Sequence, residues 1–202
     1  MIVHRIFPEP VYVSTLGRAL TKEELKTINK YKKETNKNEG NITSNDNYVL
    51  ENKTLKNLKE DLRKKVIDYF DKIICTSNSI IPCITQSWIN YTETNQFHHR
   101  HFHYNSYVSG VFYIAAKKEV DQITFYRRGQ KTFELSAAPY NDFNSPSWQC
   151  SVQTGDVFLF PSSLHHGVQK KKGNNIRISL SFNVFFKGTI GDNKVLTELT
   201  LG

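Results

Sequence analysis

The sequence has no long hydrophobic run and little cysteine. No stretch approaches the roughly 20 consecutive apolar residues of a membrane span. The opening MIVHRIFPEP also lacks the basic and apolar regions of a secretory signal. Cys75, Cys83 and Cys150 are odd in number and show no C-x-x-C spacing, which argues against a disulfide framework and favours a reducing compartment. We therefore predict a cytoplasmic protein with no membrane partner.

Acidic residues are outnumbered by basic ones. The 27 lysines and arginines against 19 aspartates and glutamates give a formal net charge of +8. Such an excess raises the question of a nucleic acid or another anionic partner. The lysines, however, are scattered over predicted helices and the loop run Lys170 to Lys172, without interleaved aromatic residues. A solvated surface is the preferred interpretation, and a nucleic-acid partner is the weaker alternative.

We expect one domain spanning residues 1–202, because this length suits a single well-buried core. Residues 1–80 are predicted to hold an N-terminal strand and supporting helices, and residues 86–186 the core of a barrel. The prolines of IFPEPVYVS place the N-terminal strand at a sheet edge. Residues 35–48 are rich in turn formers and predict a polar loop.

Two amphipathic helices are predicted, over residues 20–34 and 55–74. Thr21 and Glu24 have the spacing of a capping box, and Leu25, Ile28 and Tyr31 form one apolar stripe. The second helix has apolar residues at steps of three and four, which is typical of a helix packed against a sheet. These residues are Leu55, Leu58, Leu62, Val66, Phe70 and Ile73.

Short strands separated by turns follow the helices, which indicates an α+β domain built on a sandwich or barrel of antiparallel strands. The predicted strands cover residues 86–91, 107–115, 122–126, 148–153, 156–160 and 177–186. In the last of these, RISLSFN alternates, so that Arg177, Ser179 and Ser181 share a polar face. This face is either exposed to solvent or lines the inside of a small barrel. The segment 129–147 is too long for a hairpin turn and is interpreted as a functional loop near the barrel mouth.

Histidine is concentrated in two short segments. Six of the seven histidines belong to them. They are His98, His99, His101 and His103 in QFHHRHFH, and His165 and His166 in FPSSLHHGV. Histidine is the commonest ligand of first-row metals, and on a strand an H-x-H pair presents both imidazoles on one face. The sequence therefore predicts a metal site.

The order H-x-H, SGVFYI, FPSSLHHGV and RISLSFN, together with the opening RIFPEPVYVS, resembles the iron(II)- and 2-oxoglutarate-dependent oxygenases. It is similar in particular to a bacterial and phage group with these motifs, from about Ser87 to Phe185. The resemblance implies a double-stranded β-helix, a jelly-roll or cupin-like barrel buttressed by the N-terminal helices. It also implies iron(II), 2-oxoglutarate as cosubstrate and ascorbate as an optional reductant.

The resemblance assigns His101, His103 and His166 as the metal ligands. The superfamily pattern is H-x-D or H-x-E followed by a distal histidine, so His103 stands where a carboxylate is usual. Three imidazoles still form a facial set, but they shift the preference toward zinc or copper. An H-x-H that starts at His99 is the alternative register.

Four further residues are candidates for binding the cosubstrate, and two of them match positions of relatives. Arg177 matches the arginine that forms a bidentate salt bridge with the distal carboxylate of 2-oxoglutarate. Ser181 lies on the same face and is expected to add a hydroxyl, and Tyr113 matches a tyrosine that reaches the cosubstrate. Asn90 is a weaker candidate on a neighbouring strand. Trp88 is interpreted as a packing residue.

The predicted function is that of a 2-oxoglutarate-dependent dioxygenase, specifically a hydroxylase. One alternative is a three-histidine cupin enzyme that does not use 2-oxoglutarate, and another is a noncatalytic jelly-roll module with a structural metal. A small molecule, a protein side chain and a nucleobase all stay open as the substrate. The sequence does not indicate the oligomeric state.

Overall fold

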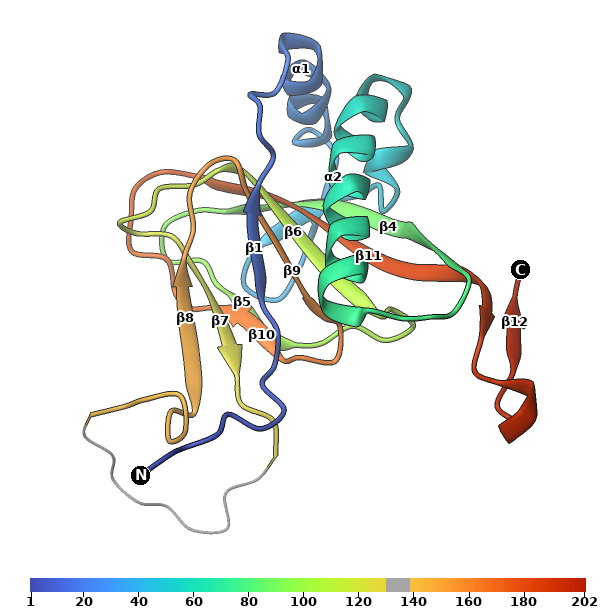
Figure 1. The fold of residues 1–202 in the computed structure, drawn as a ribbon. Coiled ribbons are helices and arrows are strands. Elements are labelled where there is room, and N and C mark those ends of the chain that lie inside the picture. Colours follow the sequence, from blue (N-terminus) through green and yellow to red (C-terminus); the bar gives the residue numbers. More distant parts are fainter. Residues whose placement is uncertain (130–138) are drawn as a thin grey trace.

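The computed structural model describes residues 1–129 and 139–202. Residues 130–138 of the predicted functional loop 129–147 therefore lie outside the described residues. Within them, the chain forms two facing β-sheets, with two helices on the outer face of the larger one (Figure 1). No helix in this part of the chain is long and apolar enough to cross a membrane.

The larger sheet has the strand order β1-β9-β6-β11-β4-β3-β2, with β12 paired to β11. Its strands are β1 (Tyr12–Thr15), β2 (Thr35–Lys37), β3 (Ile42–Ser44), β4 (Ile80–Thr92), β6 (Val108–Ala115), β9 (Asp156–Pro161), β11 (Arg177–Ile190) and β12 (Leu199–Leu201). The smaller sheet has the order β5-β10-β7-β8. Its strands are β5 (His98–His101), β7 (Gln122–Tyr126), β8 (Ser147–Ser151) and β10 (His166–Val168).

From β4 to β11 the chain crosses repeatedly between the sheets, and every pairing between these strands is antiparallel. This is the winding of a double-stranded β-helix, so the predicted fold class is confirmed. The described strands stay in two separate sheets and do not close into a continuous barrel. β1 pairs only with β9 and forms an edge of the larger sheet, as its prolines predict.

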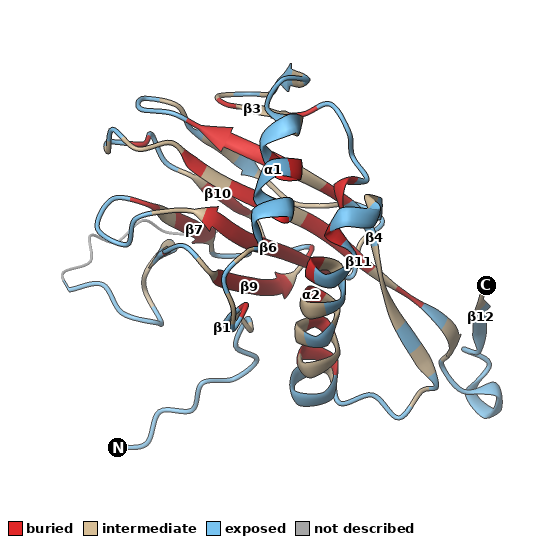
Figure 2. Cartoon of the chain, turned by 90° about the horizontal axis from the view of Figure 1, so that it is seen from above, coloured by how far each residue is buried: buried red, intermediate tan, exposed pale blue. Residues whose placement is uncertain are grey.

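The helices begin and end at local sequence signals. Helix α1 (Lys22–Tyr31) starts at Thr21, which forms the predicted capping box with Glu24. Two 3-10 turns (Val49–Glu51 and Lys53–Leu55) precede helix α2 (Lys56–Tyr69), which continues into a π turn (Phe70–Ile74). A further 3-10 turn, Asn193–Val195, precedes β12. Along α2, Leu58, Leu62 and Val66 are fully buried against the larger sheet (Figure 2).

Two sequence predictions are wrong, and two strands were not predicted. Residues 35–48 are not an irregular loop, because β2 and β3 form a hairpin that extends the larger sheet beside β4. An edge hairpin tolerates the polar side chains that suggested a loop. Leu25 is 40% exposed, so the apolar stripe of α1 is narrower than predicted. The strands β5 and β10 were not predicted, because their short histidine-rich segments lack a strand-like apolar pattern.

Two apolar cores hold these layers together. One lies between the helices and the larger sheet, and the other lies between the two sheets around Phe125, Phe158 and Phe160. The polar face of β11 points toward the smaller sheet, where Arg177 and Ser179 are buried. The predicted polar row therefore lines the interior of the fold and is not a solvent-exposed face.

Gly110 provides a test of packing between β6 and β11. A Cβ atom at this position would overlap the ring of Phe182, which is fully buried. We expect Gly110→Ala to lower the free energy of unfolding by about 1 to 3 kcal/mol, since overpacking forces neighbouring side chains to shift. Urea denaturation measures the effect. Gly202→Ala, which adds its methyl group to open space, is the control, and an unchanged midpoint for Gly110→Ala would contradict this packing.

Candidate functional site

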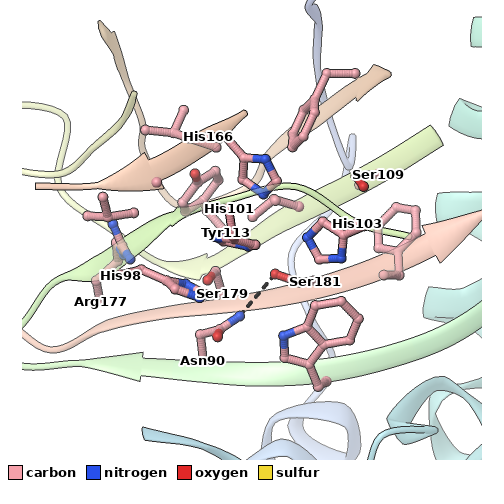
Figure 3. Close-up of a pocket in the computed structure, with 18 residues that line it drawn as sticks. Asn90, His98, His101, His103, Ser109, Tyr113, His166, Arg177, Ser179 and Ser181 are labelled. Carbon is pink, nitrogen blue, oxygen red and sulfur yellow. Dashed lines mark hydrogen bonds between the residues drawn. The ribbon is translucent and has the colours of Figure 1, made fainter. Parts of the chain in front are cut away.

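One cavity between the two sheets brings together all seven predicted site residues (Figure 3). They are Asn90, His101, His103, Tyr113, His166, Arg177 and Ser181. Sheet register explains part of this convergence. On the three central strands of the larger sheet, Ser179 of β11 lies between Asn90 of β4 and Tyr113 of β6, so the three side chains form a row across the inner face.

The three predicted metal ligands approach one another at the smaller sheet. His101 ends β5 and lies opposite His166, the first residue of β10. The ring centroids of this pair are 4.4 Å apart. His103 lies two residues beyond β5, so only His101 of the H-x-H pair lies on a strand. The potential ligand nitrogens of all three nevertheless lie within 4.8 Å of one another.

Backbone carbonyl groups orient two of these imidazoles. The Nδ1 of His101 lies 2.8 Å from the carbonyl oxygen of His99, and that of His166 lies 3.0 Å from the carbonyl oxygen of Leu164. Because a carbonyl oxygen only accepts, each Nδ1 carries the proton and each Nε2 keeps its lone pair. This is how a metal-binding histidine is commonly oriented.

Burial keeps the imidazoles neutral. It lowers the pKa of His103 to about 4, with a further contribution from His101. Burial is also the largest cause that lowers the pKa of His101 and takes the pKa of His166 well below its usual range. A neutral imidazole has the lone pair that a metal ion requires, so all three side chains are ready to bind at neutral pH.

A second histidine group overlaps with the first. His98, His99 and His101 also have their ligand atoms within 4.8 Å of one another. The Nε2 of His98, however, lies 3.2 Å from the Nδ2 of Asn38, whose amide also donates to Asn41. Since an amide nitrogen only donates, this contact engages the lone pair of His98. The geometry thus favours the group of His101, His103 and His166.

The other three histidines of the two segments are not placed to complete this group of ligands. His98 lines the cavity, and burial lowers its pKa to about 2. His99 and His165 are not among the residues that line it, and His165 packs against Phe102 with a centroid separation of 4.8 Å. The alternative register that starts at His99 is therefore disfavoured by position.

Arg177 supplies positive charge within the same cavity. Only 2% of the residue is exposed, and its Nη1 and Nη2 each donate at 3.2 Å, to the carbonyl oxygen of Gln122 and to Oγ1 of Thr92. Burial lowers the pKa of the guanidinium, while Tyr113 and Asp121 raise it. Its Nε has no hydrogen-bond partner among the described residues, and none of their carboxylates forms an ion pair with it. A buried cation of this kind fits an anionic ligand.

The polar row around Arg177 offers both donors and acceptors. Burial raises the pKa of Tyr113, so its phenol stays protonated and able to donate. Asn90 donates through Nδ2 to the hydroxyl of Ser181 at 2.9 Å, which leaves the hydroxyl proton of Ser181 for another acceptor. The Oδ1 of Asn90 is buried without a partner in the described part of the chain.

Sequence reasoning missed some of the cavity wall. Trp88 is not only a packing residue, because it lines the cavity and stacks on His103 with ring centroids 5.5 Å apart. Ser109 also lines the cavity and is hydrogen-bonded to Ser162, whose carbonyl oxygen accepts from the backbone amide of His103. The alternation of β4 indicates that Trp88 shares a face with Asn90, but no sequence pattern identifies His103 as its neighbour.

The donor set fits the groups that the motifs imply. Three neutral imidazoles with free Nε2 atoms suit a divalent first-row metal ion. The buried guanidinium, the phenol and the serine hydroxyl suit a carboxylate ligand beside that ion. A metal ion bound by three neutral side chains keeps its full double charge, which favours the binding of a further anion.

Comparison with known protein families identifies the class of protein. The segment that carries the motifs is similar to the 2OG-Fe(II) oxygenases, as the motifs predict. Residues 86–183 match the model of the family described as "Putative 2OG-Fe(II) oxygenase", and this segment nearly coincides with the one in which the motifs occur. None of the curated proteins gives a significant match to the sequence.

Solved structures of low sequence identity share the fold. A 2OG-Fe(II) oxygenase family oxidoreductase from Burkholderia pseudomallei has 16% identity and a TM-score of 0.58, with 86% of this chain and 83% of that chain covered. HygX from Streptomyces hygroscopicus, bound to nickel, 2-oxoglutarate and hygromycin B, has 12% identity and a TM-score of 0.59, with coverage of 87% and 82%. A Pseudomonas putida prolyl-4-hydroxylase has 12% identity and a TM-score of 0.56, with coverage of 89% and 93%.

The buried histidines predict a pH-dependent stability of the metal-free protein. Histidine in the unfolded chain has a pKa near 6.5, whereas the pKa of His103 in the folded chain is about 4 and that of His98 about 2. Below pH 6.5 the unfolded chain binds more protons, so stability is lost as the pH falls toward 4, by up to about 1.4 kcal/mol per pH unit for each proton. Urea titrations between pH 7 and pH 4 measure this loss.

Two variants control the pH experiment. His103→Gln should make the loss of stability with falling pH less steep, because one buried titratable ring is removed. His4 is exposed, and His4→Gln should leave the slope unchanged. Equal slopes for the wild type and His103→Gln would contradict the buried, neutral state of His103.

Proposed function

We propose that the chain is an active iron(II)- and 2-oxoglutarate-dependent hydroxylase. The observation that carries the proposal is a single cavity that combines three convergent neutral imidazoles with a buried arginine that lacks an acidic partner among the described residues. The imidazoles suit the metal ion, and the arginine suits the distal carboxylate of the keto acid.

Each residue of the cavity receives a role from its contacts. His101, His103 and His166 hold the metal ion, and the carbonyl groups of His99 and Leu164 fix two of these rings. Arg177 binds the distal carboxylate of 2-oxoglutarate through its guanidinium group. Burial strengthens this interaction, because two opposite charges attract each other more strongly away from water. Further hydrogen bonds come from the phenol of Tyr113 and the hydroxyl of Ser181, and Asn90 orients that hydroxyl.

The mechanism divides between the cofactor and the protein. A bound iron(II) ion supplies the O2-dependent decarboxylation of 2-oxoglutarate to succinate, coupled to oxidation of a C–H bond. The protein binds the keto acid at Arg177, holds the imidazoles in the tautomer with a free Nε2, and excludes water with the aromatic walls Trp88 and Phe160. No described side chain is required to move a proton in this scheme.

The buried Arg177 favours this function over the alternatives. A three-histidine cupin enzyme that does not use 2-oxoglutarate would not require a buried cation beside the metal site, and neither would a module with a structural metal. For the substrate, a small molecule or a protein side chain is preferred over a nucleobase, because the solved structures that share the fold include one bound to hygromycin B and a prolyl-4-hydroxylase. We also propose a cytoplasmic location, because Cys75, Cys83 and Cys150 are all free thiols.

Substrate-free turnover tests the proposal. With iron(II), 2-oxoglutarate, ascorbate and O2, the wild type is expected to convert 2-oxoglutarate slowly to succinate, because the cosubstrate site is complete without a hydroxylation substrate. Succinate is measured by chromatography, and its formation should vanish in His166→Ala. His165→Ala, which changes the neighbouring imidazole outside the cavity, is the matched control and should keep the wild-type rate.

If the assay detects no succinate, calorimetry of 2-oxoglutarate binding decides between the alternatives. Absence of both succinate formation and 2-oxoglutarate binding by the metal-loaded wild type would refute the proposed function. Tight zinc in a closed four-coordinate sphere would instead support the structural-metal alternative, because such a sphere leaves no position for a keto acid.

A further inference from the structure

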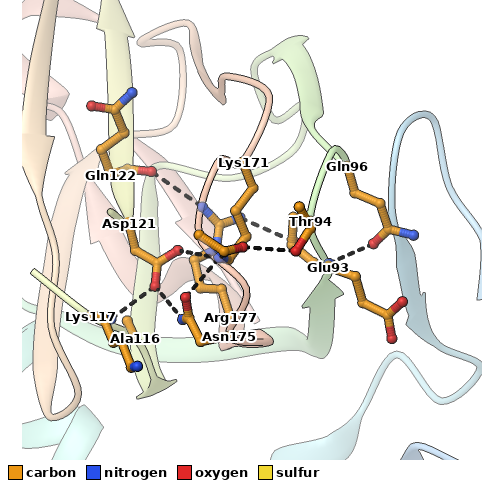
Figure 4. Close-up of polar contacts among 12 residues, drawn as sticks. Glu93, Thr94, Gln96, Ala116, Lys117, Asp121, Gln122, Lys171, Asn175 and Arg177 are labelled. Carbon is orange, nitrogen blue, oxygen red and sulfur yellow. Dashed lines mark hydrogen bonds and ion pairs between the residues drawn. The ribbon is translucent and has the colours of Figure 1, made fainter. Parts of the chain in front are cut away.

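A buried polar cluster lies beside Arg177 and is not used by the proposed function. It consists of Lys171, Asp121 and Asn175 (Figure 4). Lys171 is 3% exposed and Asp121 is 2% exposed. The sequence suggested that Lys171 belongs to a solvated basic run, and the structure shows that it is buried instead. Its neighbours Lys170 and Lys172 are exposed.

Lys171 joins three segments of the chain. Its Nζ donates to the carbonyl oxygen of Gly173 and to Oδ1 of Asn175, both at 2.8 Å, and lies 3.6 Å from Oδ1 of Asp121. Its backbone amide donates to the carbonyl oxygen of Gln96, and its own carbonyl oxygen accepts from the amide of Asn95. The loop after β10 is thereby fastened to the turn that follows β4.

Asp121 completes the cluster from the other side. Its Oδ2 accepts from Nδ2 of Asn175 and from the backbone amide of Lys117, both at 2.8 Å. The side-chain amide of Asn175 thus accepts from Lys171 and donates to Asp121, which fixes its orientation. A loop in this position has one preferred conformation, because an alternative would leave buried polar groups unpaired.

The same segments hold the guanidinium of Arg177. Asn175 precedes Arg177 by two residues, and Asp121 directly precedes Gln122, whose carbonyl oxygen accepts from Nη1. Thr92, which accepts from Nη2, ends β4 just before the turn that Lys171 fastens. The cluster therefore connects the backbone of Arg177 to both of its hydrogen-bond acceptors.

Charge supports a geometric role for this cluster. Lys171 and Arg177 are two buried cations, while Asp121 is the only buried carboxylate that the described contacts place among them. Asp121 pairs with Lys171, so the guanidinium stays available to an anion in the cavity. Buried ion pairs contribute little net stability compared with apolar residues of similar size, but they can fix one specific arrangement.

We infer that Lys171 and Asp121 are positioning residues, which align Arg177 for the distal carboxylate of 2-oxoglutarate. This inference rests on the proposed function, because it requires 2-oxoglutarate to bind at Arg177. Lys171→Met keeps most of the side-chain length but removes the charge and the three donor hydrogens. It should weaken 2-oxoglutarate binding about tenfold to a hundredfold, as misplacement of a binding group does, and leave iron(II) affinity unchanged.

Calorimetry with iron(II)-loaded protein under anaerobic conditions measures both affinities, and circular dichroism defines a temperature at which each variant is folded. Lys172→Met is the matched control at an exposed neighbouring lysine and should bind 2-oxoglutarate like the wild type. If Lys171→Met does not fold, Asp121→Asn replaces it, since it preserves the shape of the side chain. Asp121→Asn should also weaken 2-oxoglutarate binding and spare iron(II).

A double-mutant cycle distinguishes positioning from general support of the fold. If Lys171 acts through Arg177, Lys171→Met should have no further effect on 2-oxoglutarate affinity in an Arg177→Ala background. Additive effects, or an equal loss of iron(II) affinity, would overturn the inference. Failure of the wild type to bind 2-oxoglutarate would refute the proposed function itself. Wild-type affinity in a folded Lys171→Met, with Arg177→Ala impaired, would refute only the positioning role.

Discussion

Replacing His166 with alanine is expected to lower iron(II) affinity by at least about a hundredfold. Removal of a group that only orients a metal ligand already costs about tenfold to a hundredfold in metal affinity, and removal of the ligand itself should cost more. The same result is expected for His101→Ala and His103→Ala. All three imidazoles face one point, and burial holds them in the neutral form that binds metal. Anaerobic titration with iron(II), followed by equilibrium dialysis, measures the affinity.

His98→Ala and His165→Ala are the matched controls for the ligand variants. His98 has its Nε2 in contact with Asn38, and His165 packs against Phe102 outside the cavity, so neither change should alter iron(II) affinity much. Loss of binding in His98→Ala with full binding in His103→Ala would show that the overlapping histidine group holds the metal. His103→Asp, which introduces the carboxylate usual in the superfamily, should keep metal binding.

Replacing Arg177 with alanine should weaken 2-oxoglutarate binding by about 1.5 to 3 kcal/mol, the usual contribution of hydrogen bonds to a charged group. The guanidinium is buried, is held by Gln122 and Thr92, and has no acidic partner among the described residues. Iron(II) affinity should stay nearly unchanged, because the hydrogen bonds of Arg177 among the described residues go to Gln122 and Thr92 and not to the three histidines. Calorimetry of 2-oxoglutarate binding to iron(II)-loaded protein decides the outcome.

Two arginine variants sharpen this test. Arg177→Lys keeps the positive charge but loses the planar pair of donors, so its affinity should fall between those of the wild type and Arg177→Ala. Arg100 is exposed and lies over the ring of Tyr126, at 4.6 Å from the centroid, and Arg100→Ala should not change 2-oxoglutarate affinity. Equal affinities of Arg177→Ala and the wild type would remove Arg177 from the cosubstrate site.

The sequence by itself determined the local elements and the residue types of the site. The capping box at Thr21, the apolar spacing of helix α2 and the alternation of β11 depend on near neighbours, so they can be recognised without knowledge of the rest of the chain. The motif order also indicated the oxygenase family whose model residues 86–183 match. Every residue selected by this reasoning lines the same cavity.

Only the tertiary structure decided which of these groups meet, which are buried and which atoms they present. The polar segment 35–48 becomes a hairpin because β4 offers it an edge, and His103 acquires Trp88 as a neighbour through the crossing of the two sheets. Lys171 appears in sequence as one of three similar lysines, yet it alone of these is buried, because Asp121 and Asn175 are positioned to pair with it. Burial and pairing depend on contacts between segments far apart in the chain, and no local pattern encodes them.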